Sequence, residues 1–196
     1  MGLDENMSAA IKVANSVRLE VPNSSNTGFT SSYVKTGQGV VNAAPKSMLD
    51  AMRSGLSKEQ PTTPNEWLSA FRAIQDRCGK TLIGNCGELA AIACLRLREM
   101  RMYPVEYVKI ADGVSDNPAI PHLVAVIGRV ANQAPGKWPS GGQALGMPDS
   151  WDADAVICDP WDRVAYPAHQ YQSFWAGLRK HSSSPNTLTC TLVHQI

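Results

Sequence analysis

The stretch GNCGELAAIA (residues 84–93) guides the interpretation of the whole chain. Asn85 is a good N-cap residue, and Leu89 and Ala93 then recur at helical spacing, so a helix begins at Cys86. In the first turn of a helix, unpaired backbone N–H groups and the positive end of the helix dipole favour an anion. A thiol placed there has a lowered pKa and a larger thiolate fraction. The sequence therefore predicts that Cys86 is a nucleophile.

Length and composition describe one globular domain with a substantial core. The chain has 196 residues, of which 43% are hydrophobic and 18% charged, with a formal net charge of +1. A nearly neutral balance gives no reason to expect nucleic acid or a membrane surface as partner. No apolar run approaches the length of a bilayer span. Residues 1–15 hold two acidic side chains and no long apolar core, so we expect no Sec-type signal peptide.

The cysteines argue against a structural framework of disulfides or zinc. There are five of them, an odd number, and no two have CxxC spacing. We expect free thiols, and we expect Cys94, two helical turns after Cys86, to lie in the core. His169, His181 and His194 show no paired ligand spacing. The sequence therefore predicts no metal and no cofactor.

The chain divides into a leader and a catalytic region. Residues 1–44 are rich in Ser, Asn, Gly and Thr and show no sustained helical or strand period, which predicts a flexible leader. Residues 45–196 carry regular patterns. Helices are expected over 45–56, over 66–77 with Asn65 as cap, over 86–100 and over 168–180. Strands are expected over 103–110, 122–128, 153–158 and 187–194, with a long loop at 131–152. This order predicts an α+β domain with a small antiparallel sheet.

Two polar residues mark the ends of expected strands. His122 opens one apolar strand and Asp159 ends the next. In an antiparallel pair the start of one strand lies beside the end of its neighbour, so the two side chains can meet. His122 would then take the proton of Cys86 and later protonate a leaving amine, while Asp159 fixes the imidazole tautomer. Asp152 and Asp154 are the alternatives to Asp159.

Other residues near Cys86 have supporting roles. The backbone N–H of Cys86 is one expected oxyanion donor, and the second comes from Asn85, Lys80 or the 79–84 loop, among which the sequence does not choose. Gly84 and Gly87 leave little side-chain bulk beside the sulfur. Glu88 is expected to complement the helix dipole rather than to act in catalysis. Trp161 either forms a wall of the site or packs beneath it.

These three segments resemble papain-like cysteine hydrolases of the bacterial effector type. The matching motifs are NCGELA (residues 85–90), HLVAVIG (residues 122–128) and VICDPW (residues 156–161), so the resemblance covers about residues 80–165. It implies a papain-like α+β fold in which the helix that carries the nucleophile packs on a small antiparallel sheet. It also implies catalysis by Cys86, His122 and Asp159. The signature of papain itself, Cys-Gly-Ser-Cys-Trp, is absent, and no glutamine shortly precedes Cys86 as the usual oxyanion side chain.

The resemblance implies cleavage or exchange of amide bonds through a thioester. The expected function is that of a protein deamidase or protease, delivered as a bacterial effector or toxin into a target cell. A protein or peptide amide is the expected substrate, and an immunity protein or a secretion chaperone the expected partner; the polar leader is similar to effector secretion segments. A transglutaminase reaction would use the same thioester. Two alternatives stay open: a peptidoglycan amidase of the same superfamily, and a non-enzymatic interaction module in which Cys86 is structural.

Overall fold

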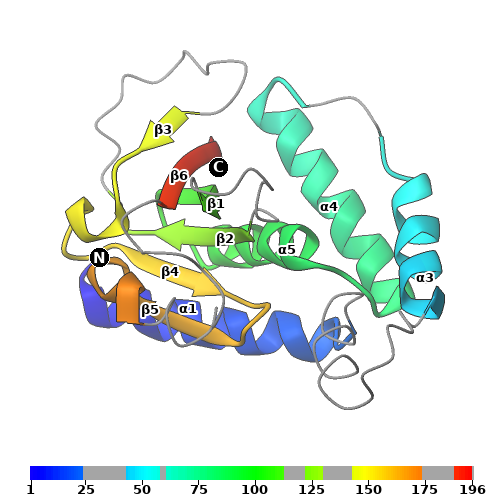
Figure 1. Cartoon of the computed structure of the whole chain (residues 1–196), viewed down its shortest axis with the longest axis horizontal. Helices are drawn as coiled ribbons and strands as arrows, with labels where there is room; N and C mark the ends of the chain where they lie inside the picture. The colour runs from blue at the N-terminus through cyan, green and yellow to red at the C-terminus, as the bar shows by residue number, and fades with distance from the viewer. Residues whose placement is uncertain (24–42, 58–60, 113–121, 130–142, 174–187, 196) are drawn as a thin grey trace.

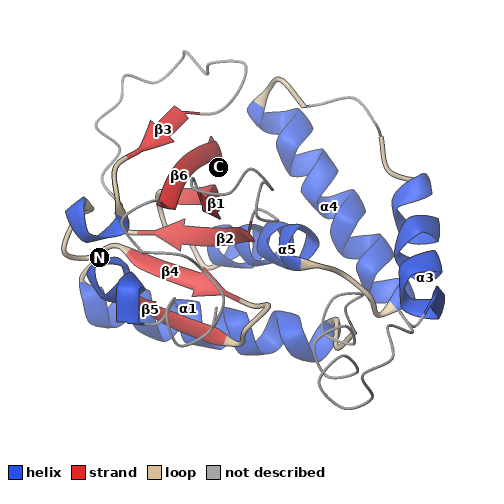
Figure 2. Cartoon of the chain, in the orientation of Figure 1, coloured by secondary structure: helices blue, strands red, loops and turns tan. Residues whose placement is uncertain are grey.

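The computed structural model describes residues 1–23, 43–57, 61–112, 122–129, 143–173 and 188–195. Its α-helices are α1 (Leu3–Glu20), α3 (Ala43–Ser54), α4 (Pro64–Thr81) and α5 (Cys86–Glu99). Its strands are β1 (Val105–Asp112), β2 (His122–Ile127), β3 (Gln143–Leu145), β4 (Val156–Asp159), β5 (Val164–Pro167) and β6 (Leu188–Gln195). Two short 3-10 helices, η1 (Pro148–Ser150) and η2 (Ala168–Gln170), lie beside strands. The expected mixture of helices and an antiparallel sheet is confirmed (Figure 2).

The six strands form one sheet in the order β3-β6-β1-β2-β4-β5, and every neighbouring pair is antiparallel. One face packs against α1 and α5; α4 lies beside α5 and also reaches strands β1 and β6 through Phe71 and Trp67, and α3 lies beyond α4 (Figure 1). The opposite face holds a second apolar cluster that includes residues of η2. Along β1, Val105 and Tyr107 join the helix-facing cluster while Val108 and Ile110 join the other, as the alternation of side chains along a strand requires. The sheet is therefore buried on both faces.

The N-terminal segment is not a leader over its first half, and this part of the sequence prediction is wrong. Residues 3–20 form helix α1, whose buried stripe consists of small side chains at helical spacing: Ala9, Ala10, Val13, Ala14 and Val17. This stripe packs on β4, β5 and α5. Alanines produce a weak hydrophobic signal, but they let the helix approach the sheet closely. The Nδ2 of Asn6 also donates to the Asp154 carbonyl over 2.8 Å. Residues 24–42 of the expected leader lie outside the described residues.

The other expected helices and strands are present with boundaries that differ by a few residues, but the described part of the expected loop over 131–152 contains strand β3 and the 3-10 helix η1, and residues 168–170 of the expected helix form the 3-10 helix η2. Helix α4 begins at Pro64, because Thr63 rather than Asn65 is the N-cap. Thr63 and Glu66 form a capping box, in which each side chain accepts a hydrogen bond from the backbone N–H of the other. Strand β5 was not expected from the sequence, since it has only four residues and ends in proline. In the structure it follows a turn in which Arg163 has a φ of 59°. Most of the helix expected over 168–180 and of the loop over 131–152 lies outside the described residues. No described helix is both long and apolar enough to cross a membrane.

Candidate active site

Helix α5 presents Cys86 at its first turn, as the sequence predicts. Asn85 is the N-cap residue, and its backbone N–H donates to the Glu88 carboxylate over 2.9 Å. Residues 88–95 of the helix are buried among the sheet, α1 and α4; Leu89 and Ala93, for example, have no exposed surface. This burial fixes the axis of α5 and with it the position of the sulfur. Glu88 is a structural cap, the role expected for it.

The segment before Cys86 is held by the N-terminal part of the chain. Asn23 forms two backbone hydrogen bonds with it, one to the Leu82 carbonyl and one from the Gly84 N–H, each 3.1 Å long. A Cβ on Gly84 would lie 3.2 Å from the Cβ of Glu88 and 3.4 Å from a methyl group of Val21. Gly84 is therefore needed for packing inside the protein. The expectation that it opens space beside the sulfur is wrong.

Gly87 also faces protein atoms. A Cβ there would lie 3.2 Å from Leu123 and 3.3 Å from the hydroxyl of Tyr107. That hydroxyl donates to the Gly87 carbonyl over 3.1 Å, and Tyr107 is nine-tenths buried. The first turn of α5 is thus fixed on two sides, by its own cap and by strand β1. The missing side chain of Gly87 is therefore matched by protein atoms from β1 and β2.

His122 and Asp159 meet where β2 begins and β4 ends. The strands pair Ala125 with Cys158, and continuing that register by one residue sets Asp159 two positions from His122 on the neighbouring strand. Their side chains form a hydrogen bond of 2.5 Å between Nε2 and Oδ2. Both are almost fully buried, with 4% and 2% of their surface exposed. The expected pairing of these two side chains is present, in a setting where a hydrogen bond to a charged group is strong.

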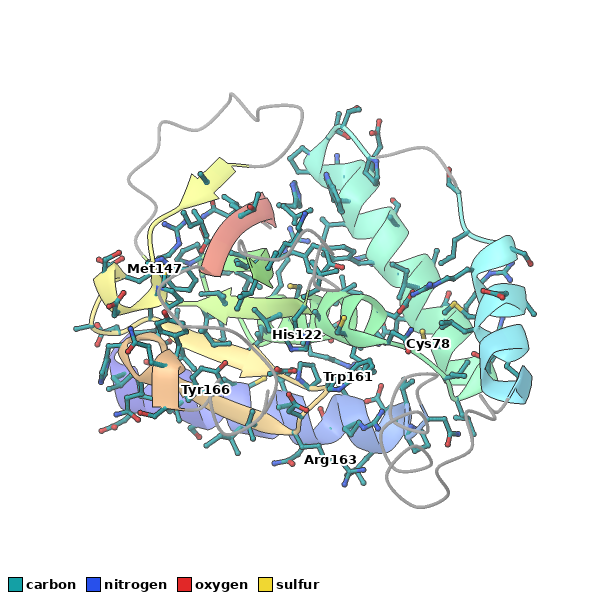
Figure 3. All side chains as sticks on the ribbon, viewed as in Figure 1. Cys78, His122, Met147, Trp161, Arg163 and Tyr166 are labelled. Atoms are coloured by element: carbon teal, nitrogen blue, oxygen red, sulfur yellow. The ribbon has the colours of Figure 1, made fainter. Side chains whose placement is uncertain are left out.

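The second oxygen of Asp159 is also occupied. Its Oδ1 accepts the backbone N–H of Trp161 over 3.1 Å and that of Asp162 over 3.4 Å, so the turn after β4 fixes the carboxylate. The Trp161 ring lies edge-on to the His122 ring, with centroids 6.4 Å apart and planes at 86°. Figure 3 shows these two side chains together, beside the end of α5. Trp161 therefore packs against the His122–Asp159 pair and limits water around it.

Cys86 differs from the other four cysteines in both exposure and charge. It is partly exposed, whereas the remaining four are buried. Burial raises the pKa of the Cys86 thiol, but a hydrogen bond with the His122 side chain, the charge of His122 and the backbone N–H of Leu123 outweigh it, and the pKa falls below its ordinary value. Burial raises the pKa of Cys78 and Cys190 to about 12 and also raises those of Cys94 and Cys158. Of the five cysteines, Cys86 is therefore the one whose surroundings favour the thiolate more than those of an ordinary thiol do.

The hydrogen-bonding pattern assigns the two nitrogens of His122. Nε2 is bonded to Asp159, so the nitrogen that faces Cys86 is Nδ1. A group of three side chains then runs from the sulfur through the imidazole to a buried carboxylate. This order corresponds to a nucleophile, a base and a group that orients the base.

The candidate oxyanion donors have different surroundings. Lys80 is exposed in the last turn of α4, and the described part of the chain shows no hydrogen bond between it and the Cys86 group. Residues 79–81 of the expected loop instead continue helix α4, and the N–H groups of Leu82 and Gly84 after it are bonded to backbone carbonyls. The N–H of Asn85 is bonded to Glu88. The N–H of Cys86 and the side chain of Asn85 belong to the two residues at the start of α5.

A metal ion does not fit between the site carboxylates and the histidine. His122, Asp159 and Asp162 offer ligand atoms within 4.8 Å of one another. However, two ligands of one ion, each at about 2.1 Å, are separated by about 3 Å or more. The 2.5 Å contact of His122 with Asp159 is instead the length of a charge-assisted hydrogen bond.

Two of the remaining histidines, His169 and His194, lie in the described residues and have other surroundings. His169 is exposed in η2, and His181 falls outside the described residues. His194 is buried in β6, stacked on Trp67 with ring centroids 4.9 Å apart, and burial lowers its pKa to about 4. Asp152 and Asp154 are exposed, so neither replaces Asp159.

Two residues of the site were not found from the sequence. Arg53, from α3, donates from Nε to the Glu88 carboxylate over 2.7 Å. Tyr107 supports the Gly87 carbonyl from β1. The strand expected over 103–110 includes Tyr107, but the sequence does not say which face of that strand meets the helices. Nothing local in the sequence connects Arg53 with Glu88, which lies 35 residues away.

Comparison of this chain with protein-family models, with curated proteins and with solved structures gave no match.

Proposed function

We propose that this chain is a cysteine hydrolase of amide bonds with a papain-like arrangement of helix and sheet. One observation carries the proposal: the partly exposed thiol with a lowered pKa is hydrogen-bonded to a histidine whose other nitrogen is held by a buried carboxylate. Structural thiols have no need of such a partner, and the four other cysteines lack one that lowers their pKa below the ordinary value. The arrangement supports nucleophilic attack on a carbonyl group.

The reaction follows from these positions. The Cys86 thiolate attacks the carbonyl carbon of the amide, and the resulting oxyanion accepts the Cys86 N–H at the start of α5. His122 delivers its Nδ1 proton to the leaving nitrogen, the C–N bond breaks, and a thioester remains on Cys86. A water molecule then gives a proton to His122 and attacks the thioester, releasing a carboxylic acid and the thiol. Asp159 keeps the Nε2 proton of His122 in place throughout.

The substrate that we propose is an amide of a protein or peptide. A primary amide of Gln or Asn would make the chain a deamidase, and a backbone amide would make it a protease. We further propose that it acts as a bacterial effector or toxin in a target cell. This part rests on the resemblance of residues 85–90, 122–128 and 156–161 to enzymes of that type.

The first test is the rate of iodoacetamide labelling at each cysteine, measured by mass spectrometry as a function of pH. Near pH 6 we expect Cys86 to react at least about tenfold faster than the other four thiols, which are internal controls. His122→Ala should lower the labelling rate of Cys86 near pH 6, because it removes the group that lowers the pKa of this thiol, whereas His169→Ala, which removes an exposed histidine, should leave the rate unchanged. Slow labelling of Cys86 in the unmodified protein would overturn the proposal.

A second test identifies the amide. Candidate target-cell proteins are incubated with the protein and with Cys86→Ala, and mass spectrometry detects Gln or Asn converted to the acid, or new chain termini. Purified peptidoglycan is treated in parallel. Release of peptides from peptidoglycan, with target-cell proteins unchanged, would favour the amidase alternative over a protein substrate.

A further inference from the structure

The negative charge of the Glu88 carboxylate disfavours a thiolate on the proposed nucleophile, Cys86. It lies two residues after Cys86, and only 7% of its surface is exposed. One oxygen caps the helix through the Asn85 N–H at 2.9 Å, so the carboxylate is held at the start of α5. A fixed negative charge there opposes the formation of a second one on the sulfur. The capping that orients Cys86 therefore also works against its thiolate.

Helix α3 supplies the compensating charge. The other oxygen of Glu88 accepts the Nε–H of Arg53 over 2.7 Å. The hydrogen bond to Glu88 raises the pKa of Arg53, and the nearby Cys86 sulfur adds to this in the same direction. The Arg53 side chain is 47% exposed, so it reaches from the surface of α3 to the buried carboxylate. Its cation interacts with both anions at the start of α5.

We propose that Arg53 is a positioning residue of the Cys86 site, which holds the Glu88 carboxylate in its capping geometry and neutralises its charge. This inference rests on the proposed function. Arg53 acts through Glu88, and neither residue takes part in a proton transfer. A second consequence is that α3, which lies outside the helix layer on the sheet, belongs to the functional unit of the protein.

Other charged and titratable groups also face Cys86 and Glu88, and the test must separate Arg53 from them. They are His122 from β2, Asp159 from β4, Tyr107 from β1, Cys78 from α4 and Asp50 from α3. None of these is altered in the Arg53 and Glu88 variants below, so their contributions cancel when each of those variants is compared with the unmodified protein.

The experiment measures the pH profile of Cys86 alkylation in four variants. Arg53→Met removes the cation, and we expect the labelling rate near pH 6 to fall about 3- to 10-fold, since the uncompensated carboxylate shifts the profile to higher pH. Arg53→Lys keeps the charge and should recover most of the rate. Glu88→Gln keeps an oxygen for the Asn85 N–H, and the double variant Arg53→Met with Glu88→Gln should return close to the unmodified profile. This recovery is what a role exerted through Glu88 requires.

Arg77→Met is the matched control. Arg77 also contacts α3, through the Met52 carbonyl at 3.5 Å, but it has no hydrogen bond with Glu88. We expect this variant to leave the Cys86 profile unchanged, even if it lowers the free energy of unfolding. Urea unfolding of every variant separates stability from thiol reactivity.

Two results would overturn the inference in distinguishable ways. An unchanged Cys86 profile in Arg53→Met, together with a large effect of His122→Ala, would refute the role of Arg53 and leave the proposed function standing. Labelling of Cys86 in the unmodified protein as slow as that of the four buried thiols would refute both.

Discussion

The substitution Asp159→Asn separates a catalytic carboxylate from a structural one. Oδ1 of Asp159 accepts two backbone N–H groups, from Trp161 at 3.1 Å and Asp162 at 3.4 Å, while Oδ2 binds His122. An asparagine at this position must therefore keep its carbonyl oxygen on the backbone side. Its NH₂ group then faces Nε2 of His122 and donates to it. His122 would carry its proton on Nδ1, and this tautomer cannot accept a proton from Cys86.

The structure sets the size of the effect. Rotating the amide to restore the working tautomer would break the two backbone hydrogen bonds, at about 0.5–1.5 kcal/mol each. Replacing the charged acceptor of His122 by a neutral one removes roughly a further 1 kcal/mol. The total of about 2–4 kcal/mol corresponds to a fall of about 30- to 1,000-fold in the rate of Cys86 alkylation near pH 6. At high pH, where the thiol ionises without help, the variant should approach the unmodified protein.

Alkylation rates across the pH range test the magnitude, and ¹⁵N chemical shifts of His122 test the tautomer directly. Asp154→Asn is the matched control, because it removes the same charge from an exposed side chain near the start of β4. It should change neither readout. Labelling of Asp159→Asn near pH 6 at the rate of the unmodified protein, with an unchanged tautomer, would refute the reasoning about this carboxylate.

Three further predictions concern the fold around the site. Val17 of α1 is fully buried, so Val17→Ala should lower the free energy of unfolding by about 1.5–3 kcal/mol, while Ile11→Ala at a 45% exposed position of the same helix should change it by less than about 0.5 kcal/mol. Equal effects in urea unfolding would contradict the packing of α1. Gly128 has a φ of 75°, and a Cβ there would collide with Asn6 and with the Asp154 carbonyl; Gly128→Ala should cost about 3 kcal/mol or more. Gly79 lies in α4, and a Cβ there has no atom within 4 Å, so Gly79→Ala should raise the free energy of unfolding by up to about 1 kcal/mol. A thermal melt that ranks the two glycine variants in the opposite order would disprove this. Burial lowers the pKa of His194 from 6.5 to about 4, so the unfolded chain binds the proton more readily than the folded protein does. The contribution of neutral His194 to the free energy of unfolding is therefore fully present above about pH 6.5. It is lost as the pH falls towards 4, by about 3 kcal/mol in total. His194→Phe, which keeps a ring stacked on Trp67, should flatten that slope, and an unaltered pH dependence would show that another group causes it.

Much of the site could be predicted because its parts are local. An N-cap before an apolar helix placed Cys86 at a helix start, and continuous apolar runs placed His122 and Asp159 at the ends of strands β2 and β4. Antiparallel pairing then brings those ends together with little freedom, because the register of two buried strands is fixed by their alternating side chains. The pairing of His122 with Asp159 follows from features within a few residues of each.

Sequence by itself therefore determined the class of the fold, the start of the nucleophile helix and the order of the three proposed catalytic residues. Only the tertiary structure decided that α1 belongs to the core, that Asn23 holds the segment before Cys86, and that Arg53 reaches Glu88. The physical reason is the same in each case. A stripe of Ala and Val has a weak hydrophobic signal, and a backbone hydrogen bond or an ion pair between segments 35 or more residues apart has no local signature, so these contacts exist only once the chain has folded around them.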